Sequence, residues 1–177
     1  TGRIAAEGFE AEVVDTRKTA DGKILHIVQV QEGGLSVGDR VKLSVDEARR
    51  RSITRNHTAT HLLNMALRHT LGSHVTQAGS LVEEGRARFD FTHFEALTPE
   101  QLDEVERLVN EAILSATDTH ISNMSMERAQ QLGAIADFEE KYGDTVRVME
   151  IPGYTVDLCG GCHLKNTGVG GRQDGLV

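Results

Sequence analysis

The chain has 177 residues, which is enough to bury one large hydrophobic core or two small ones. Its composition, 38% hydrophobic and 26% charged, is that of a folded protein, and no apolar run approaches the roughly 20 residues of a membrane span. The formal net charge of −8 argues against nucleic-acid binding through bulk positive charge, though not against a local basic patch. Two cysteines are too few for a disulfide framework and favour a reducing compartment, so we expect a cytoplasmic protein. Because the sequence has no long apolar run, we expect no membrane partner.

The first 45 residues predict β-structure. Residues 10–18 and 23–30 read as two strands, and the Asp-Gly dipeptide between them is typical of a hairpin turn. Another strand is expected within residues 35–46, after a second turn that contains glycine. We expect these strands to form either a small barrel or an open sheet, and we assign residues 1–45 to a partial β-barrel domain.

The periodicity of the sequence changes after residue 45. Residues 46–72 repeat apolar and histidine side chains at helical spacing, which predicts one long helix that ends at Gly72. His57 and His61 lie four residues apart in this segment, so their side chains project from one face of the helix, about one turn apart. Two imidazoles placed in this way can share one metal ion, but they can also be ordinary helix histidines.

The remaining segments alternate between strands and helices. A capping box at Thr98 and Gln101, with Pro99 in the first turn, marks the start of the clearest helix. The expected elements are two strands within 75–94, a helix within 97–117, a strand at 118–125, a short helix at 125–133, a strand at 144–151 and a final hairpin-like segment that carries the cysteines. The predicted fold class is therefore α+β, with a mixed α/β domain over residues 46–177.

Both cysteines lie in the stretch DLCGGCHLKNTG, residues 157–168. Cys-x-x-Cys-His is the spacing of covalent haem attachment, and Cys-x-x-Cys alone suits a redox disulfide or a zinc site. The glycine-rich residues after the motif form poor helix sequence, which disfavours haem, and no βαβ pattern surrounds the motif to favour a redox disulfide. A further interpretation is that Cys159 and His163 form a C-x-x-x-H pair that binds a metal.

The two pairs together make a set of four potential metal ligands. His57 and His61 come from a helix, whereas Cys159 and His163 come from a loop in which the glycine pair permits a tight turn. Zinc binds such sets tetrahedrally, so Zn²⁺ is the expected cofactor. Cys162 is an alternative to His163 as the fourth ligand, because Cys-x-x-Cys is an ordinary zinc spacing.

Five motifs, taken in order, resemble the editing domain of alanyl-tRNA synthetase. They are RNHTATHLLNMALR at 55–68, HVTQAGSLV at 74–82, RFDFTH at 88–93, EKYGDTVRV at 140–148 and DLCGGCHLKNTG at 157–168. The resemblance covers residues 44–168, and the leader is similar to the β-barrel that precedes the editing site in that family. Stand-alone alanyl-tRNA editing proteins share both ligand pairs, and the editing domain of threonyl-tRNA synthetase is a more distant relative.

The resemblance implies roles for particular residues. It assigns the zinc ligands as His57, His61, Cys159 and His163. The family usually has threonine at the position of Cys162. The resemblance also implies that three polar residues line the amino-acid pocket: Thr60, Thr76 and Gln77. A helix threonine can instead bond back to its own turn, and a strand glutamine can simply face solvent.

The implied activity is hydrolysis of the ester that joins a wrong amino acid to alanine tRNA, with serine as the first candidate and glycine as the second. A pocket built for alanine rejects such competitors only about 10- to 200-fold, so a second site must remove the errors. Polar side chains in that site favour serine, because without its hydroxyl they are left unpaired. The alternative is a zinc-stapled module that binds tRNA without hydrolysing the ester.

The expected partners are the acceptor end of mischarged tRNA(Ala) and the rest of the synthetase. The chain opens with Thr1 and lacks the aminoacylation core, so we interpret it as a fragment of a longer protein. Arg50, Arg51 and Arg55 precede the histidines in the same predicted helix and are candidates for binding tRNA phosphates. They can equally form a solvated helix face paired with nearby acidic residues.

Overall fold

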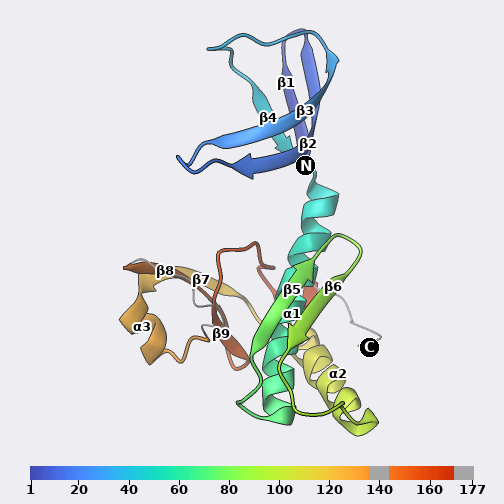
Figure 1. The fold of residues 1–177 in the computed structure, drawn as a ribbon, viewed down its shortest axis with the longest axis vertical. Coiled ribbons are helices and arrows are strands. Elements are labelled where there is room, and N and C mark those ends of the chain that lie inside the picture. Colours follow the sequence, from blue (N-terminus) through green and yellow to red (C-terminus); the bar gives the residue numbers. More distant parts are fainter. Residues whose placement is uncertain (136–143, 170–177) are drawn as a thin grey trace. The chain divides into compact units, whose positions relative to one another are not determined.

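The computed structural model describes residues 1–135 and 144–169, and it separates into two compact units, Thr1–Arg51 and Ser52–Val177 (Figure 1). Its strands and helices confirm the predicted α+β class. The boundary between the units falls inside helix α1 (Glu47–Leu71), which is the long helix predicted within residues 46–72. Among the described residues, no helix combines the length and the apolar character needed to cross a lipid bilayer.

The first unit contains one antiparallel sheet of four strands. The strands are β1 (Gly2–Ala6), β2 (Phe9–Lys18), β3 (Ile24–Glu32) and β4 (Lys42–Val45), in the spatial order β3-β2-β1-β4. β2 and β3 form the predicted hairpin, whereas the short strand β1 was not predicted. The buried side chains of this sheet come from β1 and β2 and form a small core of their own: Ile4, Phe9, Ala11 and Val13.

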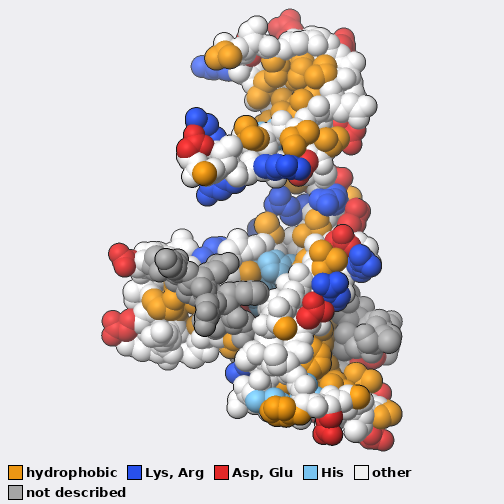
Figure 2. Space-filling model, viewed as in Figure 1, with side chains coloured by type: hydrophobic (Ala, Val, Ile, Leu, Met, Phe, Trp, Pro, Cys, Tyr) orange, Lys and Arg blue, Asp and Glu red, His pale blue; other side chains and the backbone are white. Residues whose placement is uncertain are grey.

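Of the two arrangements expected for the first unit, the open sheet is the one found. β3 and β4 are the opposite edges of the sheet, and within the described residues these edges do not pair with each other. A barrel closes only when its edge strands pair, so the expected barrel-like leader is corrected to an open sheet. The outer strands leave apolar side chains exposed, with Val30 at 53% and Leu43 at 56%. Figure 2 shows hydrophobic side chains at the surface of this unit.

The core of the second unit is formed by side chains of α1, α2 (Pro99–Leu114) and β8 (Thr145–Ile151). The predicted capping box starts α2: the Thr98 hydroxyl accepts from the Gln101 backbone N–H, and the Gln101 side chain accepts from the Thr98 N–H. The buried core residues are Leu62, Ala66 and Leu67 of α1, Val105, Val109, Ala112 and Ile113 of α2, Met149 and Ile151 of β8, and Val75.

Two sheets flank this core. β5 (Gln77–Val82) and β6 (Ala87–Phe91) form an antiparallel hairpin, and β7 (His120–Ser125), β8 and β9 (Thr155–Leu158) form a three-stranded antiparallel sheet. These strands and the short helix α3 (Met126–Gln131) agree with the elements expected from the sequence. The cysteines come directly after the β8-β9 hairpin rather than within it. Residues 140–143 of the EKYGD motif lie outside the described residues.

The segment that follows the cysteines is anchored to the end of α2. A short 3₁₀ turn, Thr167–Val169, begins with a threonine that is only 1% exposed. The Thr167 hydroxyl donates to the Ala112 carbonyl at 2.8 Å and accepts from the Thr117 N–H at 3.0 Å. These bonds hold the chain on the far side of the cysteine loop against the helical core.

Replacing Thr167 by valine keeps the shape of the side chain but removes both hydrogen bonds. We expect the free energy of unfolding of the metal-free protein to fall by about 1–3 kcal/mol, because the half-buried Thr117 N–H loses its acceptor. Urea denaturation measures this change. Thr145→Val, at an exposed strand position, is the matched control and should shift the value by less than about 0.5 kcal/mol. Equal stability of the two variants would contradict the anchoring role.

Candidate metal centre and its adjoining cavity

Four potential metal ligands converge from two distant parts of the chain. His57 and His61 lie one turn apart on α1, and Cys159 and His163 lie in the loop after β9. One ligand atom of each residue lies within 4.8 Å of the others, so the cluster could hold a metal ion. Nε2 of His57 is 3.5 Å from Sγ of Cys159, and the ring centroids of His57 and His163 are 4.4 Å apart.

The burial of His163 supports the interpretation that the cluster could hold a metal ion. Its side chain is 9% exposed, and both ring nitrogens are buried without a hydrogen-bond partner among the described residues. A buried polar atom without a partner costs free energy, and a bound cation would give one of these nitrogens a ligand role. One thiol and three imidazoles are also the donor types that zinc prefers. The residues present therefore fit a metal ion of this kind.

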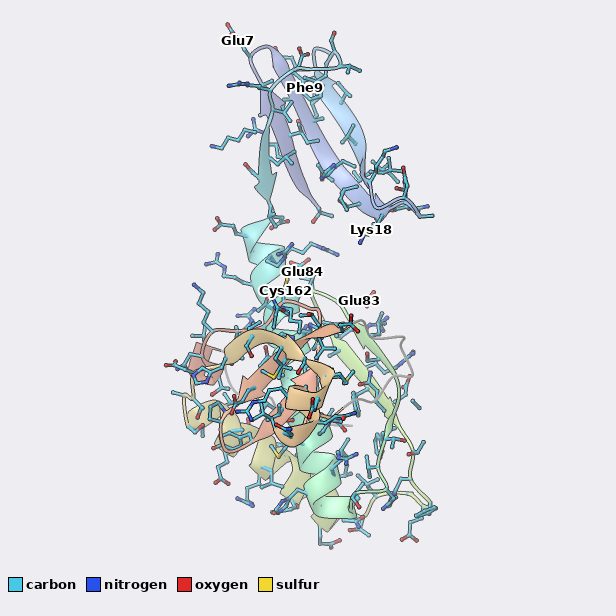
Figure 3. All side chains as sticks on the ribbon, turned by 90° about the vertical axis from the view of Figure 1, so that its left-hand side faces the viewer. Glu7, Phe9, Lys18, Glu83, Glu84 and Cys162 are labelled. Atoms are coloured by element: carbon cyan, nitrogen blue, oxygen red, sulfur yellow. The ribbon has the colours of Figure 1, made fainter. Side chains whose placement is uncertain are left out.

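Cys162 is separate from this cluster. Its side chain is exposed, and the group of four ligand atoms that lie within mutual reach contains His163 instead. Within the described part of the chain, neither cysteine forms a disulfide bond. Figure 3 labels Cys162 on the loop that carries the ligands. The geometry thus favours His163 over Cys162 as the fourth ligand, while the ligand assignment itself stays a prediction.

Hydrogen bonds to backbone atoms hold the ligand loop in place. Arg147 of β8 donates from Nη1 to the carbonyls of Cys159 at 2.6 Å and of Gly161 at 2.8 Å, and its own carbonyl accepts from the Cys159 N–H at 3.1 Å. On the other side, the hydroxyl of Thr58 on α1 accepts from the Leu164 N–H at 3.0 Å. The loop is therefore attached to β8 on one side and to the histidine helix on the other.

Gly161 leaves the space that the His57 ring occupies. A β-carbon at this position would collide with the imidazole ring of His57, whereas a β-carbon at Gly160 would meet no atom within 4 Å. The two glycines of the motif therefore differ: the backbone at residue 161 lies directly against a metal-ligand ring, and residue 160 faces open space. This close approach places the loop on the helix.

A buried carboxylate supports His61. Oδ2 of Asp157 lies 3.3 Å from Nδ1 of His61 and also accepts a hydrogen bond of 2.8 Å from the Thr155 hydroxyl. Asp157 is the first residue of the DLCGGCHLKNTG motif, but the sequence analysis predicted no role for it. The signal available in the sequence was the alternation of β9, which places residues 155 and 157 on one face of the strand.

The side chains of the cluster shift one another's pKa values. Burial acts to raise the pKa of Cys159, but the surrounding imidazoles outweigh it and lower the pKa to about 3. Burial acts to lower the pKa of His61, but Asp157 and Cys159 outweigh it and raise the pKa to about 9. Burial is the main cause that lowers the pKa of His163. The lowered pKa favours the thiolate form of Cys159, which is the form that binds metals.

A cavity of about 80 Å³ adjoins the cluster. His57, His61, Cys159 and Asp157 form one part of its wall, and the rest combines polar with apolar side chains. The polar members are Thr60, Asn64, Gln77 and Ser80, and the apolar members are Phe89, Ile135 and Leu158. This arrangement places hydroxyl and amide groups next to the potential metal site.

The structure brings two of the three predicted pocket residues to this cavity. Thr60 is buried, and its hydroxyl donates to the His57 carbonyl at 2.7 Å, as expected for a helix threonine, while the residue also lines the cavity. Gln77 lines the cavity from the start of β5. Thr76 is exposed, bonds to the Thr92 hydroxyl at 2.9 Å, and is not among the described residues of the cavity wall.

Ser80 and Asn64 were missed by the sequence interpretation. Gln77 and Ser80 are three residues apart, so regular alternation would place them on opposite faces of a strand. A register shift between Gln77 and Gly79 corrects this, because Gln77 pairs with Phe91 and Ser80 pairs with Phe89, two residues away on β6. Asn64 could have been found, since it lies four residues after Thr60 on the same helix face.

The predicted phosphate-binding arginines are all exposed on α1. Arg50 and Arg51 belong to the first unit and Arg55 to the second. Arg55 donates to the Ser52 hydroxyl at 3.1 Å. Their role in binding tRNA stays a prediction.

Comparison with known proteins adds the family context. A model of the family described as threonyl and alanyl tRNA synthetase second additional domain matches residues 146–169, which contain β8 without its first residue, β9 and the ligand loop. An alanine–tRNA ligase of Acetivibrio thermocellus is 55% identical over 170 residues, covering 96% of this chain and 19% of the relative. The enzyme of Halalkalibacterium halodurans is 52% identical, covering 92% of this chain and 18% of the relative. The resemblance to alanyl-tRNA synthetase is thereby confirmed.

The similarity extends over both structural units but only over part of each relative. The alanine–tRNA ligase of Carboxydothermus hydrogenoformans is also 51% identical over 95% of this chain. The chain spans about a fifth of the length of these relatives. The chain is therefore similar to one segment of alanine–tRNA ligases. The family match falls on the part of this chain that contains two of the four potential ligands.

The two glycines of the motif provide a matched test of the geometry. Gly161→Ala should weaken zinc binding by about tenfold or more, because its methyl group displaces the His57 ring. Gly160→Ala should bind zinc as tightly as the wild type. Competition with a chromophoric chelator measures both affinities. Equal affinities for the two variants would show that the close approach at residue 161 does not position His57.

A second pair of substitutions distinguishes the roles of the two cysteines. Cys159→Ser should lose most of its bound zinc, because it removes the thiolate from the cluster, whereas Cys162→Ser should retain about one zinc per chain. Elemental mass spectrometry after dialysis measures the metal content. Loss of zinc from Cys162→Ser with retention in His163→Ala would reverse the choice of fourth ligand.

Proposed function

We propose that this chain hydrolyses the ester bond between a wrong amino acid, serine foremost, and the acceptor end of alanine tRNA. The observation that carries the proposal is the small cavity with hydroxyl and amide groups beside the His-Cys cluster. The similarity to alanine–tRNA ligases supports the choice of tRNA(Ala) as the substrate. The reaction would act as proofreading in translation, with the rest of a synthetase as the natural partner.

The size of the cavity supports a small amino acid. Pockets that enclose drug-sized molecules are about 300–1,000 Å³, whereas this cavity is about 80 Å³. Only the amino-acid end of the substrate would enter it, and the nucleotide would remain outside. A cavity of this size suits a small amino acid such as serine or glycine better than a large one.

Polar groups in the wall support selection of serine over alanine. The Thr60 hydroxyl already donates its proton to the His57 carbonyl, so its lone pairs can accept a hydrogen bond from the serine hydroxyl. The Gln77 side chain, which also lines the cavity, can both donate and accept. With alanine in the cavity these groups would lose water and gain no partner, which disfavours its binding.

The ligand residues would hold zinc beside this cavity. Bound there, zinc would supply Lewis-acid polarisation of the ester carbonyl or orient the substrate. In the proposed reaction water adds to the carbonyl carbon, the bond to the ribose oxygen breaks, and that oxygen leaves with a proton. The products are free serine and uncharged tRNA.

Substitution of Gln77 tests the proposal. Gln77→Ala should lower the rate of serine release from Ser-tRNA(Ala) by about 10- to 100-fold, because it removes a polar group from the wall. Gln130→Ala, at an exposed position of α3, is the matched control and should hydrolyse the ester at the wild-type rate. Release of labelled serine at fixed enzyme concentration measures both.

The wild-type chain distinguishes the two functions considered. Serine release above the rate in buffer, with little release of alanine from Ala-tRNA(Ala), would support an editing hydrolase. Binding of Ser-tRNA(Ala) without serine release, in protein that contains zinc, would contradict it and support the zinc-stapled binding module instead.

A further inference from the structure

A buried chain of hydrogen-bonding groups adjoins the His-Cys cluster. Thr155 and Asp157 are 6% and 4% exposed, so both polar side chains are almost fully removed from water. The Thr155 hydroxyl donates to Oδ2 of Asp157 at 2.8 Å, and the same oxygen lies 3.3 Å from Nδ1 of His61. The three residues form a line that ends at a potential metal ligand.

The backbone fixes the position of this carboxylate. Residues 155 and 157 pair with Ile151 and Met149 of β8, both of which are fully buried in the core. On the other side of β9, Ile135 donates its N–H to the Val156 carbonyl at 2.8 Å and accepts from the Leu158 N–H at 3.1 Å. β9 is thus hydrogen-bonded along both edges, and Asp157 has little freedom to move relative to the sheet.

We propose that Asp157 is a positioning residue that holds His61 as the Nδ1–H tautomer and leaves Nε2 to bind the metal, with Thr155 orienting the carboxylate. A carboxylate can only accept a hydrogen bond, so the nitrogen that faces it must carry the proton. In a ring that carries one proton the other nitrogen keeps its lone pair, which is what a metal ligand requires. This inference rests on the metal centre proposed above and assigns a role to residues outside the ligand set.

The charge of the site points the same way. A thiolate and three neutral imidazoles around a divalent cation leave a net charge of about +1. The Asp157 carboxylate, in direct contact with one of the ligands, brings the buried group to neutrality. A net charge in a largely buried site is costly, so a carboxylate here favours a cation in the cluster.

Replacing Asp157 by asparagine in the 177-residue chain tests this role, because it keeps the shape and removes the charge. We expect zinc affinity, measured by competition with a chromophoric chelator at fixed pH, to fall by about 10- to 100-fold. In Thr155→Val the zinc affinity should fall by a smaller factor, because the carboxylate remains. Glu150→Gln is the control: Glu150 pairs with Val156, so its side chain points to the opposite face of the sheet from Asp157, and affinity should be unchanged.

The tautomer provides a readout that a purely structural role would not change. In zinc-loaded wild-type protein, nitrogen NMR of the histidine rings should show a protonated Nδ1 and a metal-bound Nε2 for His61. In Asp157→Asn the Nδ1 signal should shift or the ring should exchange between states. His61→Ala identifies the signal.

The possible outcomes distinguish a failure of the role proposed for Asp157 from a failure of the proposed function. Wild-type zinc affinity and an unchanged His61 spectrum in Asp157→Asn would overturn the inference while leaving the metal centre intact. A wild type without zinc would overturn the inference together with the metal centre, and the serine-release assay would judge the hydrolase separately. If Asp157→Asn does not fold, Thr155→Val decides: weaker zinc binding supports the role, and unchanged binding overturns it.

Discussion

The candidate functional site depends on one long-range contact, that of the loop after β9 with α1. His57 and Cys159 are 102 residues apart, yet Nε2 and Sγ lie 3.5 Å from each other. Joining such distant segments costs chain entropy, so contacts beside the ligands must stabilise their approach. Thr58 and Arg147 supply these contacts by binding the backbone of the loop, and Gly161 leaves the space that the His57 ring occupies.

Electrostatics reinforce this contact. The Cys159 thiolate and the Asp157 carboxylate both lie next to His61, and together they raise its pKa despite its burial. The same imidazoles lower the pKa of Cys159 against the effect of burial. Two negative groups in a small, half-buried volume favour a positive charge among them. The chemistry of the site is therefore prepared by the protein's own side chains, and the polar wall of the cavity adjoins it.

The similarity to alanine–tRNA ligases and the geometry of the site agree with each other. The family match falls on residues 146–169, which supply Cys159, His163, Arg147 and Asp157. The aligned stretch also includes α1, which supplies the two remaining potential ligands and Thr60, because the relatives match 92–96% of the chain. An acidic chain can still serve an RNA substrate if the substrate is recognised at a small local site rather than through bulk charge.

Local patterns in the sequence determined most of the elements and the candidate ligands. Helical spacing placed His57 and His61 on one face, and the capping box at Thr98 marked the start of α2. Such patterns extend over one turn or one strand, so they could not show which segments pack together. Only the tertiary structure decided that the first sheet is open, that a register shift after Gln77 turns Ser80 into the cavity, and that Asp157 faces His61. Each of these depends on contacts between residues far apart in the chain, which no local spacing encodes.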